Sequence, residues 1–329
     1  MDNTQAGGDW YDLYPLDHHR VAVVVGDVVG QGPTAAAIMG QLRSALGAHL
    51  VAGRSPGAAL DHLSDYARRI PGARGSTAIC VVVDTVTGEL CWASAGHVPP
   101  LRITPDGTAD HLTGGEGTLL GIHPRPPTPQ AEERATPGTS LVLYTDGLVE
   151  RRGEVVDDGM ARLADRGRLA HHEGPDRLAA LLLDDDAHPR SADDIALVVA
   201  RVLPPPLRVT RTAGPQAPAV ARGQAGSWAG STGLPADATD DLVLAISEAV
   251  TNAVEHAYPD GSAGPITWSC ALAEDHSVQV TVADVGRWRV PPDEPGHRGR
   301  GLLMIREVAA SSRIASTDSG TTVTFTIPV

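Results

Sequence analysis

Short apolar runs separated by glycine, proline and aspartate dominate the first part of the chain. Valine-rich runs of this kind, bounded by turn residues, are typical of β-strands. We therefore expect strands over residues 21–25, 77–83, 90–95, 141–144 and 195–199. The sequence DTVTGEL between two of these runs predicts a hairpin turn in which Gly88 supplies the unusual backbone angle.

Two longer segments in the same region, 33–51 and 55–70, have the pattern of helices. Each has a proline near its start, where the N–H that proline lacks would have no partner within the helix. The region as a whole therefore predicts a largely β core with helices around it.

Three consecutive prolines, Pro204 to Pro206, interrupt this pattern because proline cannot continue a regular element. We place a domain boundary at this linker, with one domain over 1–203 and a second over 207–329. Two domains also agree with the usual size of roughly 100–200 residues per domain. After the linker, 207–211 predicts a short strand, and the Gly/Ala/Ser-rich stretch up to Thr232 is compatible with a weak helix or a loop.

The most regular helical pattern in the chain covers residues 234–258, and another helix is expected over 302–310. Three strand-like runs accompany these helices, over 266–271, 278–283 and 321–327. Both domains are therefore expected to combine strands with helices, and the fold class expected for the chain is α+β with two domains.

Composition and charge exclude several classes of function. The formal net charge of −14 opposes binding to nucleic acid or to an anionic membrane, so we expect neither as a partner. All 26 basic residues are arginine, because the chain contains no lysine. This composition excludes a Walker A loop, a Schiff-base lysine and the phosphate-binding lysine of eukaryotic-type protein kinases.

The three cysteines, Cys80, Cys91 and Cys270, form no CxxC motif and no zinc-type spacing with histidine. An odd and sparse set of this kind is typical of the reducing cytosol. The N-terminus has no basic start followed by an apolar core, and no run of about 18 apolar residues occurs later. We therefore expect a cytoplasmic protein without a membrane span.

Three aspartates stand at the ends of expected strands: Asp27 after VAVVVG, Asp146 after LVLYT, and Asp193 before IALVV. A sheet can bring such ends together, and hard divalent ions prefer several carboxylate oxygens as ligands. Two ions about 4 Å apart can hold a hydroxide for attack on a phosphate ester. The alternative for each aspartate taken alone is a solvated turn cap beside glycine.

The segments GGDWYD, GDVVGQG, LVLYTDG and ADDIALVV together resemble the PPM family of metal-dependent Ser/Thr phosphatases, over about residues 7–202. The resemblance is specifically to the bacterial SpoIIE/RsbU-type branch, which acts on antagonists of anti-sigma factors. The resemblance implies a β-sandwich flanked by helices and a site with two Mn or Mg ions. Asp27 corresponds to the bridging and catalytic ligand, with the Val28 carbonyl as a second donor to one metal. Asp146 and Asp193 correspond to the remaining ligands, ahead of Asp194.

Asp9 matches the first acidic position of that family, and Asp12 is close enough to compete for it. The chain departs from the family in having Gln31 where a histidine is usual. It also lacks the usual strand before GGDWYD, so that it is either an excerpt or built differently at that edge. No arginine precedes the first acidic position, and His97 in SAGHVPP is expected to support a turn.

In the second domain, Glu248, Asn252 and His256 are spaced i, i+4, i+8, which confines them to about 80° of a helix. The adjoining stripe is apolar and is expected to face a core: Leu242, Ile246, Ala249, Ala253 and Ala257. The helix therefore presents an acid, an amide and an imidazole beside its packed face. An ordinary amphipathic helix with a polar side is the alternative.

The segments SEAVTNAVEHAY, VADVG, GRGL and GTTVTF together resemble the GHKL (Bergerat) ATPase fold, an α/β sandwich, in its SpoIIAB/RsbW-like anti-sigma-factor kinase form, over about residues 207–329. The resemblance implies ATP and Mg as cofactors. Asn252 would coordinate magnesium, and Glu248 would act as general base on the attacking hydroxyl. Asp284 would accept a hydrogen bond from adenine, and Gly286 would let the base approach.

The same resemblance implies further nucleotide-binding residues. Gly299, Arg300 and Gly301 would form a phosphate lid, since glycines before a helix let backbone N–H groups approach phosphates. His256 would lie near the phosphates, and Thr321 or Thr322 near adenine.

Together the two resemblances imply a bifunctional regulator of a sigma factor in partner switching, as in bacterial stress responses. The first domain would dephosphorylate a STAS-type anti-anti-sigma protein, and the second would phosphorylate it, bind the sigma factor, or both; a homodimer is compatible with this arrangement. In one alternative the second domain binds ATP or the sigma factor without catalysis. In another the first domain is a degenerate scaffold.

Overall fold

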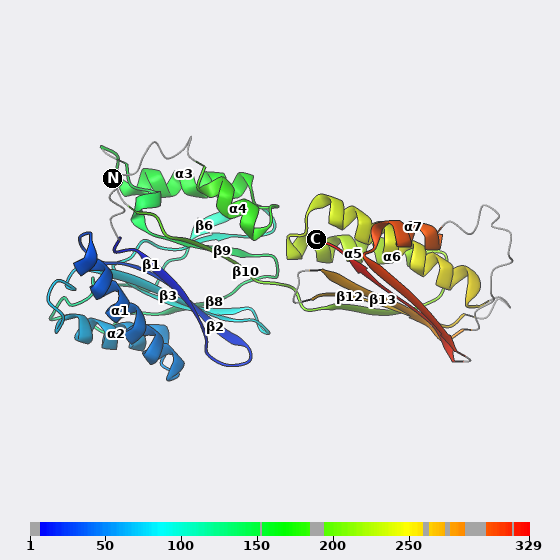
Figure 1. The fold of residues 1–329 in the computed structure, drawn as a ribbon, viewed down its shortest axis with the longest axis horizontal. Helices are drawn as coiled ribbons and strands as arrows, with labels where there is room; N and C mark the ends of the chain where they lie inside the picture. The colour runs from blue at the N-terminus through cyan, green and yellow to red at the C-terminus, as the bar shows by residue number, and fades with distance from the viewer. Residues whose placement is uncertain are drawn as a thin grey trace. The chain divides into compact units, whose positions relative to one another are not determined.

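The computed structural model divides the chain into two compact units, Met1–Leu203 and Pro204–Val329 (Figure 1). The residues that the structure describes are 7–151, 153–184, 194–258, 263–273, 277–286, 301–317 and 319–329. Among them, no helix is both long enough and apolar enough to cross a membrane. All three cysteines are free thiols.

The first unit contains two sheets. The larger has the strand order β1-β2-β3-β4-β7, with β8 also paired to β4, and the smaller has the order β10-β9-β5-β6. The strands of the larger sheet are β1 (Trp10–Pro15), β2 (Arg20–Asp27), β3 (Thr77–Asp84), β4 (Glu89–Ala95), β7 (Glu116–Gly117) and β8 (Ala131–Arg134). Those of the smaller are β5 (Leu101–Ile103), β6 (Ala109–His111), β9 (Ser140–Tyr144) and β10 (Leu197–Arg201).

The valine runs explain how these sheets pack. In β2, Val23 and Val25 point into a core that they share with Leu141 and Leu143 of β9, so the two sheets form a sandwich. The alternate residues of β2 face the helices α1 (Pro33–Val51) and α2 (Pro56–Ala67) on the outside. Because both faces of the strand are covered, its sequence is continuously apolar.

The smaller sheet is covered on its outer face by α3 (Val156–Leu169) and α4 (Pro175–Leu182), whose leucines pack against Leu101 and Tyr144. Figure 1 shows the resulting layers, with α1 and α2 on one side of the sandwich and α3 and α4 on the other. A short 3-10 helix, η1 (Asp146–Leu148), directly follows β9.

The second unit is one antiparallel sheet in the order β11-β12-β13-β15-β14 with its helices on one face (Figure 1). Its strands are β11 (Leu207–Thr212), β12 (Pro265–Leu272), β13 (Val278–Asp284), β14 (Ser311–Thr317) and β15 (Gly320–Ile327). Its helices are α5 (Ala217–Thr232), α6 (Ala236–His256) and α7 (Gly301–Val308). Trp268 and Phe325 of the sheet meet Leu242 and Ile246 of α6 in the core.

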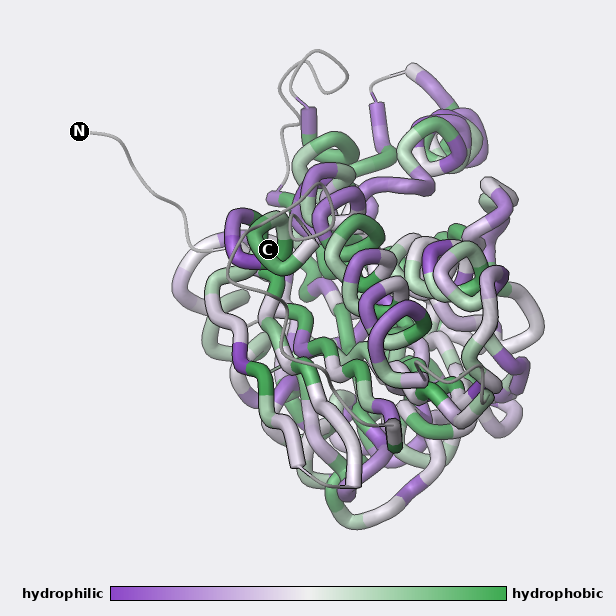
Figure 2. Tube along the Cα trace, turned by 90° about the vertical axis from the view of Figure 1, so that its right-hand side faces the viewer, coloured by the Kyte–Doolittle hydropathy of each residue, from purple (hydrophilic) through white to green (hydrophobic). Residues whose placement is uncertain are grey.

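The structure confirms the expected α+β class, the apolar stripe of the long helix, and the strands and helices predicted from the apolar runs. Gly88 has the expected left-handed backbone, with φ of 73°. The ambiguous stretch before Thr232 forms the helix α5, which is built largely of alanine and glycine. Alternation of hydrophobic and hydrophilic residues along the helices is visible as green and purple in Figure 2.

Candidate functional site

Asp27 is the last residue of β2, and the segment before β1 packs directly against it. A Cβ added to Gly8 would lie 2.4 Å from the Val28 carbonyl oxygen and 3.2 Å from Asp27 Oδ1. Only glycine can approach a carbonyl this closely. Gly8 therefore lets the N-terminal segment lie across the end of β2, next to the two donors predicted for one metal.

Thr145 links Asp9 to the ends of β9 and β10. Its hydroxyl donates to Asp9 Oδ2 over 2.6 Å and accepts the backbone N–H of Ala196 over 2.8 Å. The backbone N–H of Thr145 in turn donates to the Ala196 carbonyl oxygen over 3.0 Å. Since Thr145 is fully buried, this network fixes the Asp9 carboxylate against the smaller sheet.

Asp146 follows Thr145 and begins η1, whose first carbonyl accepts the N–H groups of Val149 and Glu150. The next residue, Gly147, lies against the Asp194 backbone, because an added Cβ would come 2.3 Å from the Asp194 carbonyl oxygen. The structure thus brings Asp9, Asp27 and Asp146 to one end of the sandwich. Asp193 lies outside the described residues.

The donors at this end are all oxygens: carboxylates and the buried Val28 carbonyl. Oxygen donors of this type fit Mg²⁺ or Mn²⁺ rather than zinc or copper. Within the described ranges, no three His, Cys, Asp or Glu side chains lie close enough together to hold an ion. The full ligand set, which includes Asp193, therefore stays a prediction.

The structure separates the two candidates for the first acidic position. Asp12 lies within β1, and its Oδ2 is 3.7 Å from Nε of Arg43 in α1. The neighbouring Tyr14 hydroxyl donates to the Arg43 carbonyl oxygen, so this side of β1 faces α1. Asp9 contacts the ends of the strands, whereas Asp12 does not.

His97 is buried, and its ring joins two strand ends. Nδ1 lies 2.7 Å from the Thr77 hydroxyl, and Nε2 lies 3.0 Å from the Tyr144 carbonyl oxygen. Burial lowers the pKa of His97 to about 4, so the ring is neutral at physiological pH. A neutral ring can donate to the carbonyl and accept from the hydroxyl, which confirms the expected turn-supporting position.

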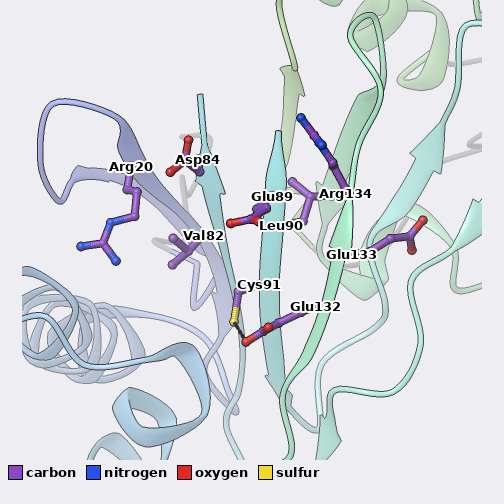
Figure 3. Close-up of a pocket in the computed structure, with 9 residues that line it drawn as sticks. All are labelled: Arg20, Val82, Asp84, Glu89, Leu90, Cys91, Glu132, Glu133 and Arg134. Atoms are coloured by element: carbon purple, nitrogen blue, oxygen red, sulfur yellow. Dashed lines mark hydrogen bonds between the residues drawn. The ribbon is translucent and has the colours of Figure 1, made fainter. Parts of the chain in front are cut away.

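A groove of about 400 Å³ lies at the opposite end of the larger sheet, where β2 begins at Arg20 and β3 ends at Asp84 (Figure 3). In the groove the Cys91 thiol donates to Glu132 Oε1 over 3.8 Å. Burial and the Glu132 carboxylate raise the pKa of Cys91 to about 11. The thiol is therefore protonated at neutral pH and is not an activated nucleophile.

In the second unit, Gly301 at the start of α7 lies over the polar side of α6. A Cβ added to Gly301 would be 2.6 Å from Glu248 Oε2 and 3.4 Å from Asn252 Nδ2. Asn252 Nδ2 is buried and has no hydrogen-bond partner among the described residues. Since Nδ2 is a hydrogen-bond donor, only an acceptor atom could satisfy it.

Asp284 ends β13 and is 7% exposed. Its Oδ1 accepts the backbone N–H groups of Gly286 over 3.0 Å and of Thr321 over 3.3 Å. Burial raises the pKa of Asp284 despite these two bonds, which act in the opposite direction. A Cβ on Gly286 would come 2.0 Å from the Ala257 carbonyl oxygen, so the end of α6 and Asp284 lie together.

Of the other residues predicted to bind the nucleotide, some lie near Asp284 or on α6, and others lie outside the described residues. Thr321 is buried beside Asp284, whereas Thr322 points to the other face of β15, as alternation along a strand requires. His256 ends α6, with Nε2 4.0 Å from Glu255 Oε2. Gly299 and Arg300 lie outside the described residues.

Two family models match the chain. One, described as stage II sporulation protein E (SpoIIE), covers residues 17–203, and the other, described as a histidine kinase-like ATPase domain, covers 212–327. Among solved structures, the RsbU and RsbW domains of Rv1364c from Mycobacterium tuberculosis are 34% identical, with a TM-score of 0.56. That match covers 99% of this chain and 91% of the other.

Two curated relatives match one half each. The phosphoserine phosphatase RsbP of Bacillus subtilis is 28% identical over 153 residues, which are 45% of this chain and 38% of the relative. The serine-protein kinase RsbW of Oceanobacillus iheyensis is 39% identical over 74 residues, which are 22% of this chain and 46% of the relative. The chain spans less than half the length of each.

Proposed function

Since this chain belongs to the SpoIIE family, and carries a histidine kinase-like ATPase domain after the SpoIIE domain, we propose that it both removes and adds a protein phosphate. The first unit hydrolyses a phosphoserine or phosphothreonine, and the second transfers the γ-phosphoryl group of ATP to the same residue. The observation that carries this proposal is that each unit has its own group of acidic residues. Asp9, Asp27 and Asp146 lie at the ends of strands in the first unit, and Glu248 and Asp284 lie on α6 and at the end of β13 in the second.

In the first unit, Asp9, Asp27, Asp146 and Asp193 would hold two Mg or Mn ions together with the Val28 carbonyl. When bound, such ions supply a hydroxide nucleophile and offset the charge of the phosphoryl group. The protein's own part is to hold the carboxylates in place. Thr145 keeps Asp9 oriented through its hydroxyl, and Gly8 admits the N-terminal segment against Asp27.

In the second unit, Glu248 takes the proton of the attacking serine or threonine hydroxyl. The hydroxyl oxygen forms a bond to the γ-phosphorus while the bond to the β-phosphate oxygen breaks, and ADP leaves. Asn252 would coordinate Mg through its side-chain oxygen, because the Nδ2 group can only donate hydrogen bonds. Asp284 would accept a hydrogen bond from the adenine amino group. Gly301, which lies beside Glu248 and Asn252, would belong to the phosphate lid.

Further residues take supporting roles in this pocket. Gly286 lets the base approach Asp284, and Thr321 lies beside that carboxylate, where adenine would bind. His256, Gly299 and Arg300 would contact the phosphates. Thr322 faces away from Asp284, which makes Thr321 the better candidate for the adenine contact.

We take the substrate of both units to be a small STAS-type anti-anti-sigma protein, and the partner of the second unit to be a sigma factor. The proposal is supported by relatives named as a phosphoserine phosphatase and as a serine-protein kinase. A cytoplasmic location follows from such partners. The competing hypothesis is that the second unit only binds its partners and catalyses no phosphorylation. The experiment below distinguishes the two.

The test is to incubate the full-length protein with a candidate STAS protein, first with ATP and Mg²⁺ and then with its phosphorylated form and Mn²⁺. We expect phosphorylation in the first reaction and release of inorganic phosphate in the second, both followed by phosphate-affinity gel electrophoresis. A protein that hydrolyses phosphoserine but never transfers phosphate, while it still retains a sigma factor, would be a phosphatase with a binding module.

Replacing Asp284 by alanine should weaken ATP binding about 10- to 100-fold, because a hydrogen bond to a charged group contributes about 1.5–3 kcal/mol. Calorimetric titration of the full chain with ATP and Mg²⁺ measures the change. Gln279→Ala on the same strand is the control, since Gln279 is exposed and should bind ATP as the parent does. Equal affinity of parent and Asp284→Ala would mean that adenine binds elsewhere.

A further inference from the structure

The backbone of His97 is held by the larger sheet of the first unit, just after β4. The Ser94 hydroxyl accepts the His97 backbone N–H and donates to the His97 carbonyl oxygen, each over 3.0 Å. The preceding residue, Gly96, forms a β-bridge with Ala78 of β3. The place of His97 beside β3 and β4 is therefore fixed independently of its side chain.

The His97 ring extends from this sheet to the smaller one. Its Nε2 lies 3.0 Å from the carbonyl oxygen of Tyr144, the last residue of β9, and its Nδ1 lies 2.7 Å from the Thr77 hydroxyl at the start of β3. A carbonyl oxygen can only accept a hydrogen bond, so Nε2 carries the proton, and Nδ1 of the neutral ring accepts from Thr77. The ring is thus a buried bridge between the two sheets, with one defined direction for each bond.

The two ends of this bridge adjoin different members of the predicted metal site. Thr77 is the direct cross-strand partner of Asp27 in the pairing of β2 with β3. On the other side, the residues that follow β9 are Thr145, which donates to Asp9, and Asp146. The bridge therefore joins the strand end that carries Asp27 to the strand end that carries Asp146 and holds Asp9.

We propose that His97 is a positioning residue that holds the two sheets at the spacing the metal ions require, and that it thereby sets the affinity of the first unit for Mn²⁺ or Mg²⁺. Two ions about 4 Å apart need ligands from both strand ends, so a change in the spacing of the sheets moves Asp27 relative to Asp146. Groups that orient metal ligands from outside the coordination shell typically change metal affinity about 10- to 100-fold. The inference rests on the proposed phosphatase function and adds to it a residue that does not touch the ions.

The competing role for His97 is support of the turn after β4, with an effect on folding alone. Loss of such a support lowers the unfolding temperature and the folded fraction, but the molecules that remain folded bind Mn²⁺ as the parent does. The positioning role predicts instead that folded molecules bind Mn²⁺ more weakly. Metal affinity measured on folded protein therefore separates the two roles.

The experiment compares variants of the full-length protein at the two ends of the bridge. Thr77→Val removes the hydroxyl and keeps the shape of the side chain, whereas Thr77→Ser keeps the hydroxyl. His97→Leu removes both bonds, including the ring N–H that the Tyr144 carbonyl accepts. Ser64→Ala is the control, because Ser64 is also buried and accepts a backbone N–H, from Gly121, but takes no part in the bridge.

Two quantities are measured: the dissociation constant of Mn²⁺ without substrate, by calorimetry, and the Mn²⁺ concentration that gives half-maximal hydrolysis of a phosphoserine peptide. We expect His97→Leu to raise both about 10- to 100-fold, and Thr77→Val to raise both by a smaller factor. Thr77→Ser should restore the parent values, and Ser64→Ala should match the parent. Thermal unfolding of each variant shows that the measurements are made on folded protein.

The inference is overturned if folded His97→Leu and Thr77→Val bind Mn²⁺ as tightly as the parent, even when both unfold at a lower temperature. It is also overturned if Ser64→Ala weakens Mn²⁺ binding as much as Thr77→Val does. If His97→Leu does not fold, the comparison of Thr77→Val with Thr77→Ser decides. Failure of the phosphatase function gives a different result, because the parent then hydrolyses no phosphoserine peptide, whereas Mn²⁺ binding by the variants still tests the bridge.

Discussion

Alanine in place of Asp27 is expected to slow hydrolysis of a phosphoserine substrate on the order of a thousandfold. The bridging carboxylate is proposed to hold both ions, so its removal disperses the pair and costs several kcal/mol of transition-state stabilisation. Asp27 ends β2 at the point where Gly8 packs against it.

The measurement is the steady-state rate of phosphate release from a phosphoserine peptide with Mn²⁺, for the parent, Asp27→Ala and Asp146→Ala. Asp65→Ala is the matched control, because Asp65 is an exposed carboxylate on α2 that is not among the proposed metal ligands. If the parent, Asp27→Ala and Asp146→Ala all hydrolyse the peptide at the same rate, the metal site lies elsewhere. Manganese binding measured in parallel should fall in the two site variants only.

Alanine in place of Glu248 is expected to reduce phosphorylation of the antagonist about 100- to 10,000-fold while ATP still binds. A general base is needed to take the proton of the attacking hydroxyl, and it is not needed to hold the nucleotide. Glu248 and Asn252 both lie near Gly301. Glu248→Ala removes only the carboxylate, so the Asn252 side chain that is proposed to coordinate Mg is unchanged.

Single-turnover phosphorylation with labelled ATP measures this effect, and Asp240→Ala, an exposed carboxylate earlier on the same helix, is the control. Dephosphorylation by the first unit should persist in Glu248→Ala. In the reciprocal variant, Asp27→Ala, phosphorylated antagonist should accumulate because only the removal step is lost. If Glu248→Ala phosphorylates the antagonist as fast as the parent, Glu248 is not the general base.

The strands and helices that the sequence predicts best are those buried on defined faces. The valine run of β2 and the stripe of α6 are each surrounded by core, so burial dictates their residues. By contrast, β14 is exposed along its whole length and has no apolar periodicity to detect. The sequence also fails to predict the helix α5 clearly, because its alanines and glycines pack closely without forming an amphipathic pattern.

The candidate sites show the same limit. Motif spacing locates Asp27, Asp146 and Asp284, and the two family models confirm the resemblances that these motifs suggest. Spacing does not reveal that Thr145 joins Asp9 to Ala196, since these partners are distant in sequence. Nor does it reveal that Asp12 faces Arg43, which depends on how α1 docks on β1 through Tyr14.

The bond between Thr145 and Asp9 also sets an order of events during synthesis. Asp9 precedes Thr145, to which it is bonded, by 136 residues, so it is translated well before Thr145 and Ala196. The larger sheet can pair most of its strands before β9 and β10 exist, because its long strands are close in sequence. Asp9 is therefore translated long before β10, the last strand of its unit, can hold it in place. A nascent chain stalled before residue 196 would contain every strand of the larger sheet, while the contacts of Asp9 with Thr145 and Ala196 would still be incomplete.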